Sequence, residues 1–343
     1  MDKQGKLNAL YATDEGFVEV LIVSLTSLFE NSCRPIRVFV IEDGLSQKSI
    51  NMLEDLATHY CQEIEFIKIP DYSSMFGRVI DAKRYALSAF SRLFVSSMLP
   101  PEITRVLYLD CDTIICEDLG DLWNTDLQGA VMGAVNDCRS YRYSTNLGLS
   151  RNDVYFNSGV LIIDLDLYRK EGIEERFAAA IFEFDGLLEF PDNDLICREL
   201  AGKIKELHPR YNLISVVRAL SVSELLVFRN PDNYYSSDLV EEAKNNPAIV
   251  HYTSFFAFNG RPWNKGYDEF DGRFFSCYRA ISLVRDVPLR VNWSNWGSRS
   301  RILFSAMPRA VSLRLFGFVH SVLKPTVQYF ALKRYKKAFR NEF

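Results

Sequence analysis

The first 110 residues alternate between short apolar runs and amphipathic segments, and this alternation limits the possible folds more than any other feature of the chain. The runs at 7–12, 36–41, 64–69 and 105–109 are short and bulky, which predicts buried strands. Residues 17–29, 46–60 and 87–98 carry apolar side chains at helical intervals. Strands that alternate with helices build a mostly parallel sheet with helices on both faces, so we predict an α/β fold.

Later segments extend this pattern, with further strands predicted at 130–135, 157–164 and 248–252 and helices near 172–185 and 192–200. The chain has 343 residues and 48% hydrophobic residues, which fits one large domain with an appendage, or two domains. Its seven cysteines are scattered and form no CxxC pair, which indicates free thiols in a reducing compartment. No apolar signal segment precedes the first strand, so we expect the catalytic part in the cytoplasm.

The fourth predicted strand runs directly into two carboxylates, Asp110 and Asp112. In open α/β sheets ligands bind at the carboxyl ends of strands. Two carboxylates at such a point can hold a hard divalent cation such as Mg²⁺ or Mn²⁺. Aspartate is also common in turns, so a solvated strand end is the alternative interpretation.

Two reactions use such a pair of aspartates. In haloacid-dehalogenase-like phosphatases the first aspartate is a nucleophile and the second a general acid/base. That reaction needs a later acidic pair, and this chain has no Gly-Asp-x-x-x-Asp; three strand–helix units also precede the motif. In nucleotide-sugar transfer, a metal held by the pair neutralises the diphosphate leaving group. That reaction predicts a further metal ligand, a nucleoside pocket and polar groups near the sugar.

Six segments resemble glycosyltransferase family 8, retaining transferases that include bacterial lipopolysaccharide and lipooligosaccharide galactosyl- and glucosyltransferases. The segments are 11–17 (YATDEGF), 90–93 (FSRL), 106–123 with both aspartates and DLGDLW, 155–160 (YFNSGV), 191–194 (PDND), and 251–252 (HY) with 261–263 (RPW). Their order and spacing agree from about residue 7 to 265. The resemblance implies one Rossmann-like nucleotide-diphospho-sugar transferase domain of GT-A type over 1–286, with a mostly parallel mixed sheet.

The resemblance also implies roles for individual residues. Asp110, Asp112 and His251 would bind the metal, and an imidazole beside two carboxylates suits Mn²⁺ more than Mg²⁺. Asp192 and Asn193 would act at the sugar, Asn193 at the position where some members carry Gln near the anomeric carbon. The implied donor-binding residues are Ala12, Asp14, Phe17, Arg92, Asp110, Cys111, Asp112, Asn157, Ser158, Asp192, Gly260 and Arg261.

Each of these roles has a structural alternative. Phe17 can be the first core residue of its helix, Arg92 a surface ion pair, and His251 a hydrogen-bonded core histidine. The 192–194 segment can simply cap a helix after Pro191.

The sequence departs from the family at two places. Arg261 stands where the family usually has Lys before Pro-Trp, with Lys265 nearby, so either cation can contact the diphosphate. The stretch 253–260 is longer than usual and aromatic, and it can contribute to the acceptor site or only pack.

Residues 287–343 form a region of different character. They contain eleven Lys and Arg and one acidic residue, a charge of +10, which leaves −14 for residues 1–286 because the whole chain carries −4. The longest charge-free run, 315–323, is too short to cross a bilayer. Val311, Leu315, Phe318, Val319 and Val322 share one helical face. We therefore predict a basic amphipathic helical tail on an anionic membrane surface, with a docked helix as the alternative.

Together these observations predict a metal-dependent hexosyltransferase. It would move a hexose, Glc or Gal, from a UDP-sugar to a glycan or glycolipid hydroxyl with retention, in cell-surface polysaccharide or lipopolysaccharide synthesis. We expect the protein at the inner face of the cytoplasmic membrane and no nucleic-acid partner. Retention can use a covalent intermediate or front-face attack, and the poor nucleophilicity of Asn193 favours the latter. The alternatives are the phosphatase and a non-catalytic, membrane-associated sugar-nucleotide-binding protein.

Overall fold

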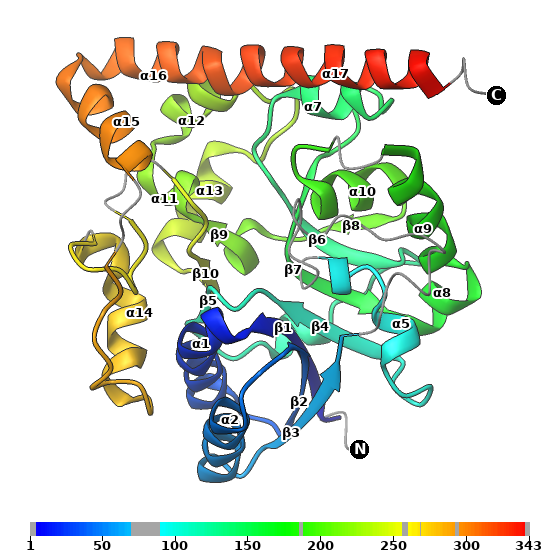
Figure 1. The fold of residues 1–343 in the computed structure, drawn as a ribbon, viewed down its shortest axis with the longest axis vertical. Coiled ribbons are helices and arrows are strands. Elements are labelled where there is room, and N and C mark those ends of the chain that lie inside the picture. Colours follow the sequence, from blue (N-terminus) through cyan, green and yellow to red (C-terminus); the bar gives the residue numbers. More distant parts are fainter. Residues whose placement is uncertain are drawn as a thin grey trace.

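A seven-stranded mixed sheet forms the centre of the protein (Figure 1). The computed structural model describes residues 5–69, 90–184, 188–255, 260–267, 269–291 and 295–339. Strand β1 pairs in parallel with β2 and β4, β2 with β3, and β6 with β8, whereas β7 runs antiparallel to β4 and β6. The strands, in spatial order, are β3 (Glu63–Lys68), β2 (Ile36–Asp43), β1 (Leu7–Asp14), β4 (Arg105–Leu109), β7 (Phe156–Asp164), β6 (Met132–Asn136) and β8 (Ile204–Glu206). The predicted α/β class with a mostly parallel mixed sheet is confirmed.

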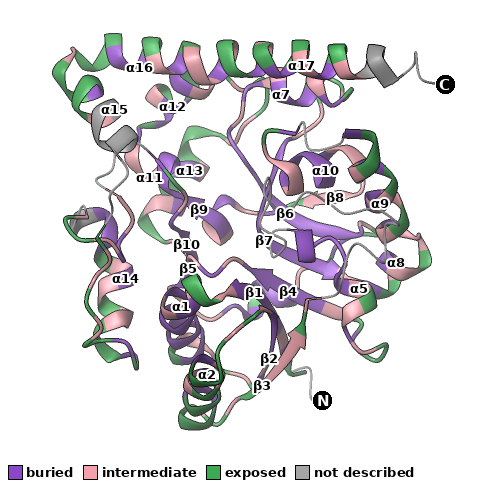
Figure 2. Cartoon of the chain, viewed as in Figure 1, coloured by how far each residue is buried: buried purple, intermediate pink, exposed green. Residues whose placement is uncertain are grey.

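Helices cover both faces of this sheet, which is why its strands are apolar on both sides. Along β2, Val38 and Val40 face one hydrophobic cluster while Phe39 and Ile41 face another. Figure 2 shows the sheet as the buried centre of the molecule. The first cluster is closed by the short helix η1 (Glu15–Phe17) and by α1 (Val18–Asn31), α2 (Gln47–His59) and α6 (Gly120–Trp123); the second by α5 (Val95–Met98), α8 (Leu165–Lys170), α9 (Ile173–Phe184) and α10 (Pro191–Glu199).

The helix predicted over 87–98 is interrupted. Residues 87–89 lie outside the described chain, and within the described part a turn at 92–94 separates two helical residues from α5. The Leu93 carbonyl accepts the Tyr168 hydroxyl at 2.8 Å, and Arg92 extends toward the strand ends. Within this turn the Leu93 amide donates to the Phe90 carbonyl and the Phe94 amide to the Ser91 carbonyl, three residues back instead of the four of an α-helix.

A second, three-stranded sheet brings distant segments beside the end of β4. It consists of β5 (Thr113–Ile115), β10 (Ile249–His251) and β9 (Leu213–Ile214), and His251 pairs with Thr113 in antiparallel register. Asp110 and Asp112 therefore lie in the short connection between the two sheets, with His251 beside it. The surrounding helices are η2 (Pro209–Asn212), α11 (Ser215–Ala219), α12 (Val222–Arg229), α13 (Ser237–Asn245) and α14 (Glu269–Ile281).

The C-terminal segment is helical and docks along one edge of the domain (Figure 1). It comprises α15 (Asn295–Ala306), α16 (Arg309–Phe318), the π-helical turn η3 (Val319–Leu323) and α17 (Lys324–Phe339). Helix α16 packs on α12, and α17 packs on α7 (Tyr141–Asn146). Tyr143 donates to the His320 carbonyl at 3.0 Å and Asn146 to the Pro325 carbonyl at 2.7 Å.

The outer face of these docked helices remains apolar and exposed. Val311, Leu315 and Phe318 are about half exposed, as are Val327 and Phe330 on α17, and Figure 2 shows this outer face as exposed. The C-terminal helices therefore dock on the domain with one side, while an apolar face on their other side stays exposed to solvent. Within the described chain, no helix combines the length and apolarity needed to span a membrane.

Candidate metal and donor site

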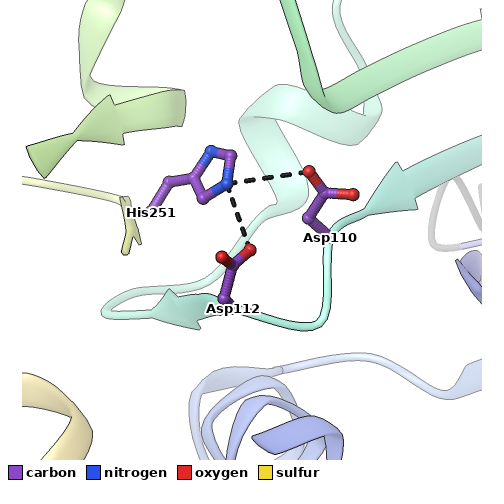
Figure 3. Close-up of side chains that lie close together, drawn as sticks. All are labelled: Asp110, Asp112 and His251. Atoms are coloured by element: carbon purple, nitrogen blue, oxygen red, sulfur yellow. Dashed lines mark ion pairs between the residues drawn. The ribbon is translucent and has the colours of Figure 1, made fainter. Parts of the chain in front are cut away.

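Asp110, Asp112 and His251 converge at the junction of the two sheets (Figure 3). His251 Nε2 lies 3.1 Å from an Asp112 carboxylate oxygen and 3.6 Å from one of Asp110. One ligand atom from each residue lies within 4.8 Å of the others. His251 is buried and both aspartates are partly buried, so this oxygen–oxygen–nitrogen set fits a divalent cation.

The turn between β4 and β5 is held by its own backbone. The Asp110 amide donates to the Gly159 carbonyl at 2.8 Å, and the Thr113 amide and hydroxyl both donate to the Asp110 carbonyl. On the other side the Tyr252 amide donates to the Asp112 carbonyl at 2.9 Å. Both carboxylates therefore leave a fixed backbone and point toward His251.

Gly159 makes the close approach of His251 possible. A Cβ atom at this position would lie 2.2 Å from His251 Cε1 and 2.8 Å from Asp110 Oδ2. Any side chain here would displace two of the three candidate ligands. A glycine inside a strand often marks such an approach, and this signal was present in the sequence.

The side-chain amides of Asn212 and Asn157 orient His251 through linked hydrogen bonds. Its Nδ1 lies 2.8 Å from Asn212 Oδ1, and Asn212 Nδ2 donates to Asn157 Oδ1 at 2.7 Å, which fixes the orientation of the Asn212 amide. Because Asn212 Oδ1 accepts, Nδ1 carries the proton and Nε2 faces the carboxylates, the arrangement typical of a metal-ligating histidine. Sequence reasoning missed Asn212, since no pattern distinguishes it from an ordinary polar residue.

Two arginines neutralise the carboxylates. Arg92 pairs with Asp110 at 2.9 Å and with Asp192 at 3.1 Å, and Arg261 pairs with Asp112 at 2.8 Å. Burial acts to raise the pKa of Asp112, but His251 and Arg261 outweigh it and hold this pKa below its usual value. Arg92 is thus a buried bridge between Asp110 and Asp192 rather than a surface ion pair.

The residues predicted at the sugar lie at the start of α10. Ser158 connects them to β7: its hydroxyl donates to Asp192 Oδ2 at 2.6 Å and its amide to Asn193 Oδ1 at 2.9 Å. The N-cap residue of α10, Phe190, has no side-chain cap, and its amide donates to Asp194 Oδ2 at 3.0 Å. Asp192 and Asn193 therefore face the strand end, while Asp194 secures the helix start.

The predicted nucleoside residues lie at the end of β1 and the turn after it. The Cys111 thiol donates to the Ala12 carbonyl at 3.1 Å. Asp14 Oδ1 is shielded from solvent and has no hydrogen-bond partner within the described chain. Phe17 makes an edge contact with Trp263 at 6.0 Å between ring centroids, so its ring joins β1 to the 261–263 segment.

The two basic residues predicted to contact the diphosphate, Arg261 and Lys265, lie in different surroundings. Arg261 contacts Asp112, whereas Lys265 is exposed. Gly260 precedes Arg261 with a φ of +86°, a conformation that favours glycine. Half of the aromatic stretch 253–260, residues 256–259, lies outside the described residues.

Comparison with solved structures shows that the fold is that of the GT-A glycosyltransferases. The galactosyltransferase LgtC, solved in complex with donor and acceptor sugar analogs, superposes with a TM-score of 0.67 at 20% identity, covering 81% of this chain and 96% of LgtC. The profile of Glycosyl transferase family 8 matches residues 8–266, and the chain therefore belongs to that family. It is a glycosyltransferase, which replaces the phosphatase and the non-catalytic binding protein as interpretations.

Curated relatives agree with the family. General stress protein A of Bacillus subtilis is 26% identical over 77% of this chain and 90% of its own length. Lipopolysaccharide 1,2-glucosyltransferase of Escherichia coli K12 is 26% identical over 76% of this chain and 73% of its own length.

Proposed function

We propose that this enzyme transfers Glc or Gal from a UDP-sugar to a hydroxyl of a glycan or glycolipid, with retention and with Mn²⁺ as its metal, in cell-surface polysaccharide or lipopolysaccharide synthesis. One observation carries the proposal. The Asp110, Asp112 and His251 cluster lies between Arg261 on one side and the start of α10 on the other, and Arg92 links the cluster to Asp192. The names of the lipopolysaccharide transferases among the relatives support the substrate class.

The proposed roles follow from these positions. A divalent cation held by Asp110, Asp112 and His251 would neutralise the diphosphate leaving group. Arg261 would turn from Asp112 to the diphosphate when donor binds, a planar fork suited to phosphate oxygens. Asp14 and Phe17 would hold the nucleoside, with Ala12, Cys111 and Gly260 providing close backbone contact. Arg92, Asn157, Ser158 and Asp192 would fix the sugar hydroxyls.

Asn193 supports front-face attack as the route to retention. Its amide oxygen already accepts the Ser158 amide and is a poor nucleophile, so it would stabilise rather than form a bond with the anomeric carbon. In the proposed step the bond from this carbon to the diphosphate oxygen breaks and the acceptor oxygen bonds on the same face. The acceptor proton passes to the departing diphosphate.

A donor screen tests this function. The protein is incubated with several UDP-sugars and Mn²⁺, and UDP release is measured with and without EDTA. We expect Mn²⁺-dependent release with UDP-Glc or UDP-Gal, reduced about a thousandfold in Asp112→Asn because a metal ligand supplies several kcal/mol of charge stabilisation. Asp121→Asn, an exposed residue on α6, is the matched control. No release with any donor and no Mn²⁺-dependent UDP binding would overturn the proposal.

We also propose that the 287–343 segment binds an anionic membrane surface, at the inner face of the cytoplasmic membrane. The support is the row of exposed apolar residues on α16 and α17, with Arg314, Lys324, Lys333 and Arg334 exposed on the same helices. Apolar and basic side chains on one exposed helical surface fit interfacial binding. Such binding would bring the donor site close to a glycolipid acceptor.

A further inference from the structure

A second group of charges lies beyond the sugar end of the donor site, where α12 and the C-terminal helices meet the sheet. Asp137 follows β6, and its Oδ2 lies 3.0 Å from Arg139 Nε and 3.4 Å from Asn157 Nδ2. Arg229 ends α12 and interacts electrostatically with both Asp137 and Arg139. We call Asp137, Arg139 and Arg229 the arginine cluster. Because Asn157 is a proposed donor-sugar residue, the cluster begins one hydrogen bond from the donor site.

Arg139 is held rigidly beside the start of α10. Its Cζ lies 3.7 Å from the centre of the Phe190 ring, a cation–π contact, and 6.0 Å from the rings of Tyr143 and Tyr155. Phe190 immediately precedes α10, which carries Asp192 and Asn193. The charge of Arg139 is matched by Asp137.

Arg229, in contrast, has an unmatched charge. Arg229 is partly exposed, its Cζ lies 5.4 Å from the centre of the Phe228 ring, and its Nε is shielded from solvent without an acceptor in the described part of the chain. Burial, and next the neighbouring Arg139, lower the pKa of Arg229 to about 10 despite Asp137. The guanidinium therefore remains charged at neutral pH.

The other charges near Arg229 do not compensate it. Lys324 lies 3.7 Å from Glu189, and the Asp194 carboxyl accepts the Tyr155 hydroxyl and the Phe190 amide. The His320 ring packs against Phe228, and burial followed by Arg229 lowers the pKa of His320 to about 4, so it is neutral at pH 7.

Helix geometry alone does not explain Arg229. A cation in the last turn of a helix gains a modest stabilisation from the helix dipole. Shielding one guanidinium nitrogen from water without an acceptor costs more than this gain. A residue that costs stability in this way is typical of a binding site.

We propose that Arg229, with Arg139 beside it, binds a phosphate or carboxylate group carried by the acceptor, so that the acceptor is an anionic glycan or glycolipid. The guanidinium fork pairs with either anion through two parallel hydrogen bonds. This inference rests on the proposed transfer reaction, because it places the acceptor beside the donor sugar.

Binding of small sugars tests the inference. With Mn²⁺ and UDP present, calorimetry measures the Kd of glucose 6-phosphate, glucuronate and glucose for wild type, Arg229→Gln, Arg229→Lys and Arg314→Gln. We expect wild type to bind at least one anionic sugar about tenfold or more tightly than glucose. Arg229→Gln should lose this preference, Arg229→Lys should keep part of it, and Arg314→Gln, an exposed arginine on α16, should keep all of it. The melting temperature of Arg229→Gln should be equal to or higher than that of wild type.

Three results would overturn the inference. One is equal binding of charged and neutral sugars by wild type. Another is loss of the preference in both Arg229 variants together with a lower melting temperature, which would make the role structural. The third is tighter binding of dihexanoyl phosphatidate than of glucose 6-phosphate, which would assign the cluster to lipid headgroups. Failure of the proposed transfer function is distinguished from failure of this inference by a different measurement. In that case wild type releases no UDP from any donor, even when no acceptor is present.

Discussion

The donor site and the C-terminal side of the molecule handle charge in opposite ways. Around the metal residues the charges are balanced inside the chain: Arg92 pairs with Asp110, Arg261 with Asp112, and Asn212 holds His251. On the C-terminal side the shielded Nε of Arg229 has no acceptor in the described chain, and apolar side chains on α16 and α17 face solvent. The candidate donor site is therefore held in place by its own contacts, whereas the C-terminal side exposes groups that we propose bind other molecules.

This difference predicts two kinds of mutational effect. Substitutions within the balanced donor site disturb several linked contacts and should remove catalysis. Substitutions of the exposed apolar residues on α16 and α17 remove no hydrogen-bonded partner, so they should change binding while leaving stability nearly unchanged.

The largest expected effect comes from Gly159→Ala. The added Cβ would displace His251 and Asp110, so we expect the rate of UDP release to fall about a thousandfold, the loss of several kcal/mol of metal assistance. The upward shift in melting temperature caused by Mn²⁺ in wild type should also disappear.

Gly133→Ala is the matched control for this clash. Its Cβ would lie 2.8 Å from Ile162 Cγ2 and 3.0 Å from Leu207 Cδ2, so it also crowds the sheet, but only in the core. It should lower the melting temperature while keeping the Mn²⁺ shift. If both variants kept the Mn²⁺ shift, Gly159 would not be what holds His251 against Asp110.

A smaller effect is expected from Phe318→Ser combined with Phe330→Ser. Each ring is about half exposed, and burying two such rings in a membrane interface is worth about 3 kcal/mol in total, so binding to phosphatidylglycerol vesicles should fall about a hundredfold. Vesicle co-sedimentation measures this affinity, and donor hydrolysis in solution should not change.

Phe182→Ser, an exposed phenylalanine on α9, is the control and should bind vesicles like wild type. Equal loss in the control would remove the C-terminal helices as the membrane surface. Point variants are preferable to truncation at 287, because deletion would uncover the docking contacts of Tyr143, Asn146 and Phe228.

The sequence predicted the strand before Asp110 and Asp112 well because its signals are local. The apolar pattern and its position in the chain are enough to predict a strand that ends at Asp110 and Asp112. Strand β4 begins and ends where predicted, at Arg105–Leu109. The family resemblance added His251, which no periodicity could have connected to Asp110. Asn212 was missed because its role exists only through contacts with His251 and Asn157.

Docking of the C-terminal helices could not be predicted from the same kind of pattern. The hydrophobic period identified the face of Val311, Leu315 and Phe318, and this face points outward. The inward contacts combine buried apolar side chains, such as Leu313 and Leu332, with small residues. A Cβ on Gly317 would lie 3.0 Å from Phe228 backbone atoms, and Ser321 donates to the Phe228 carbonyl at 2.8 Å. Small residues allow close backbone approach but leave no apolar stripe in the sequence.

Asp194 lies where the two regions meet, and it gives the smallest expected effect. It is fully buried between the donor residues of α10 and Tyr155, and burial raises the pKa of its carboxyl from 3.8 to about 6. The folded protein therefore retains a proton that the unfolded chain releases, and this contribution to stability is lost as pH rises from about 4 to 6. Asp194→Asn removes the titration. Relative to this variant, the free energy of unfolding of wild type should decrease by on the order of 2 kcal/mol across that range, measured by urea denaturation at each pH. A difference that stays constant or increases with pH would show that the Asp194 carboxyl is already ionised in the fold, and the charge balance of the donor site would then extend through α10 to the arginine cluster.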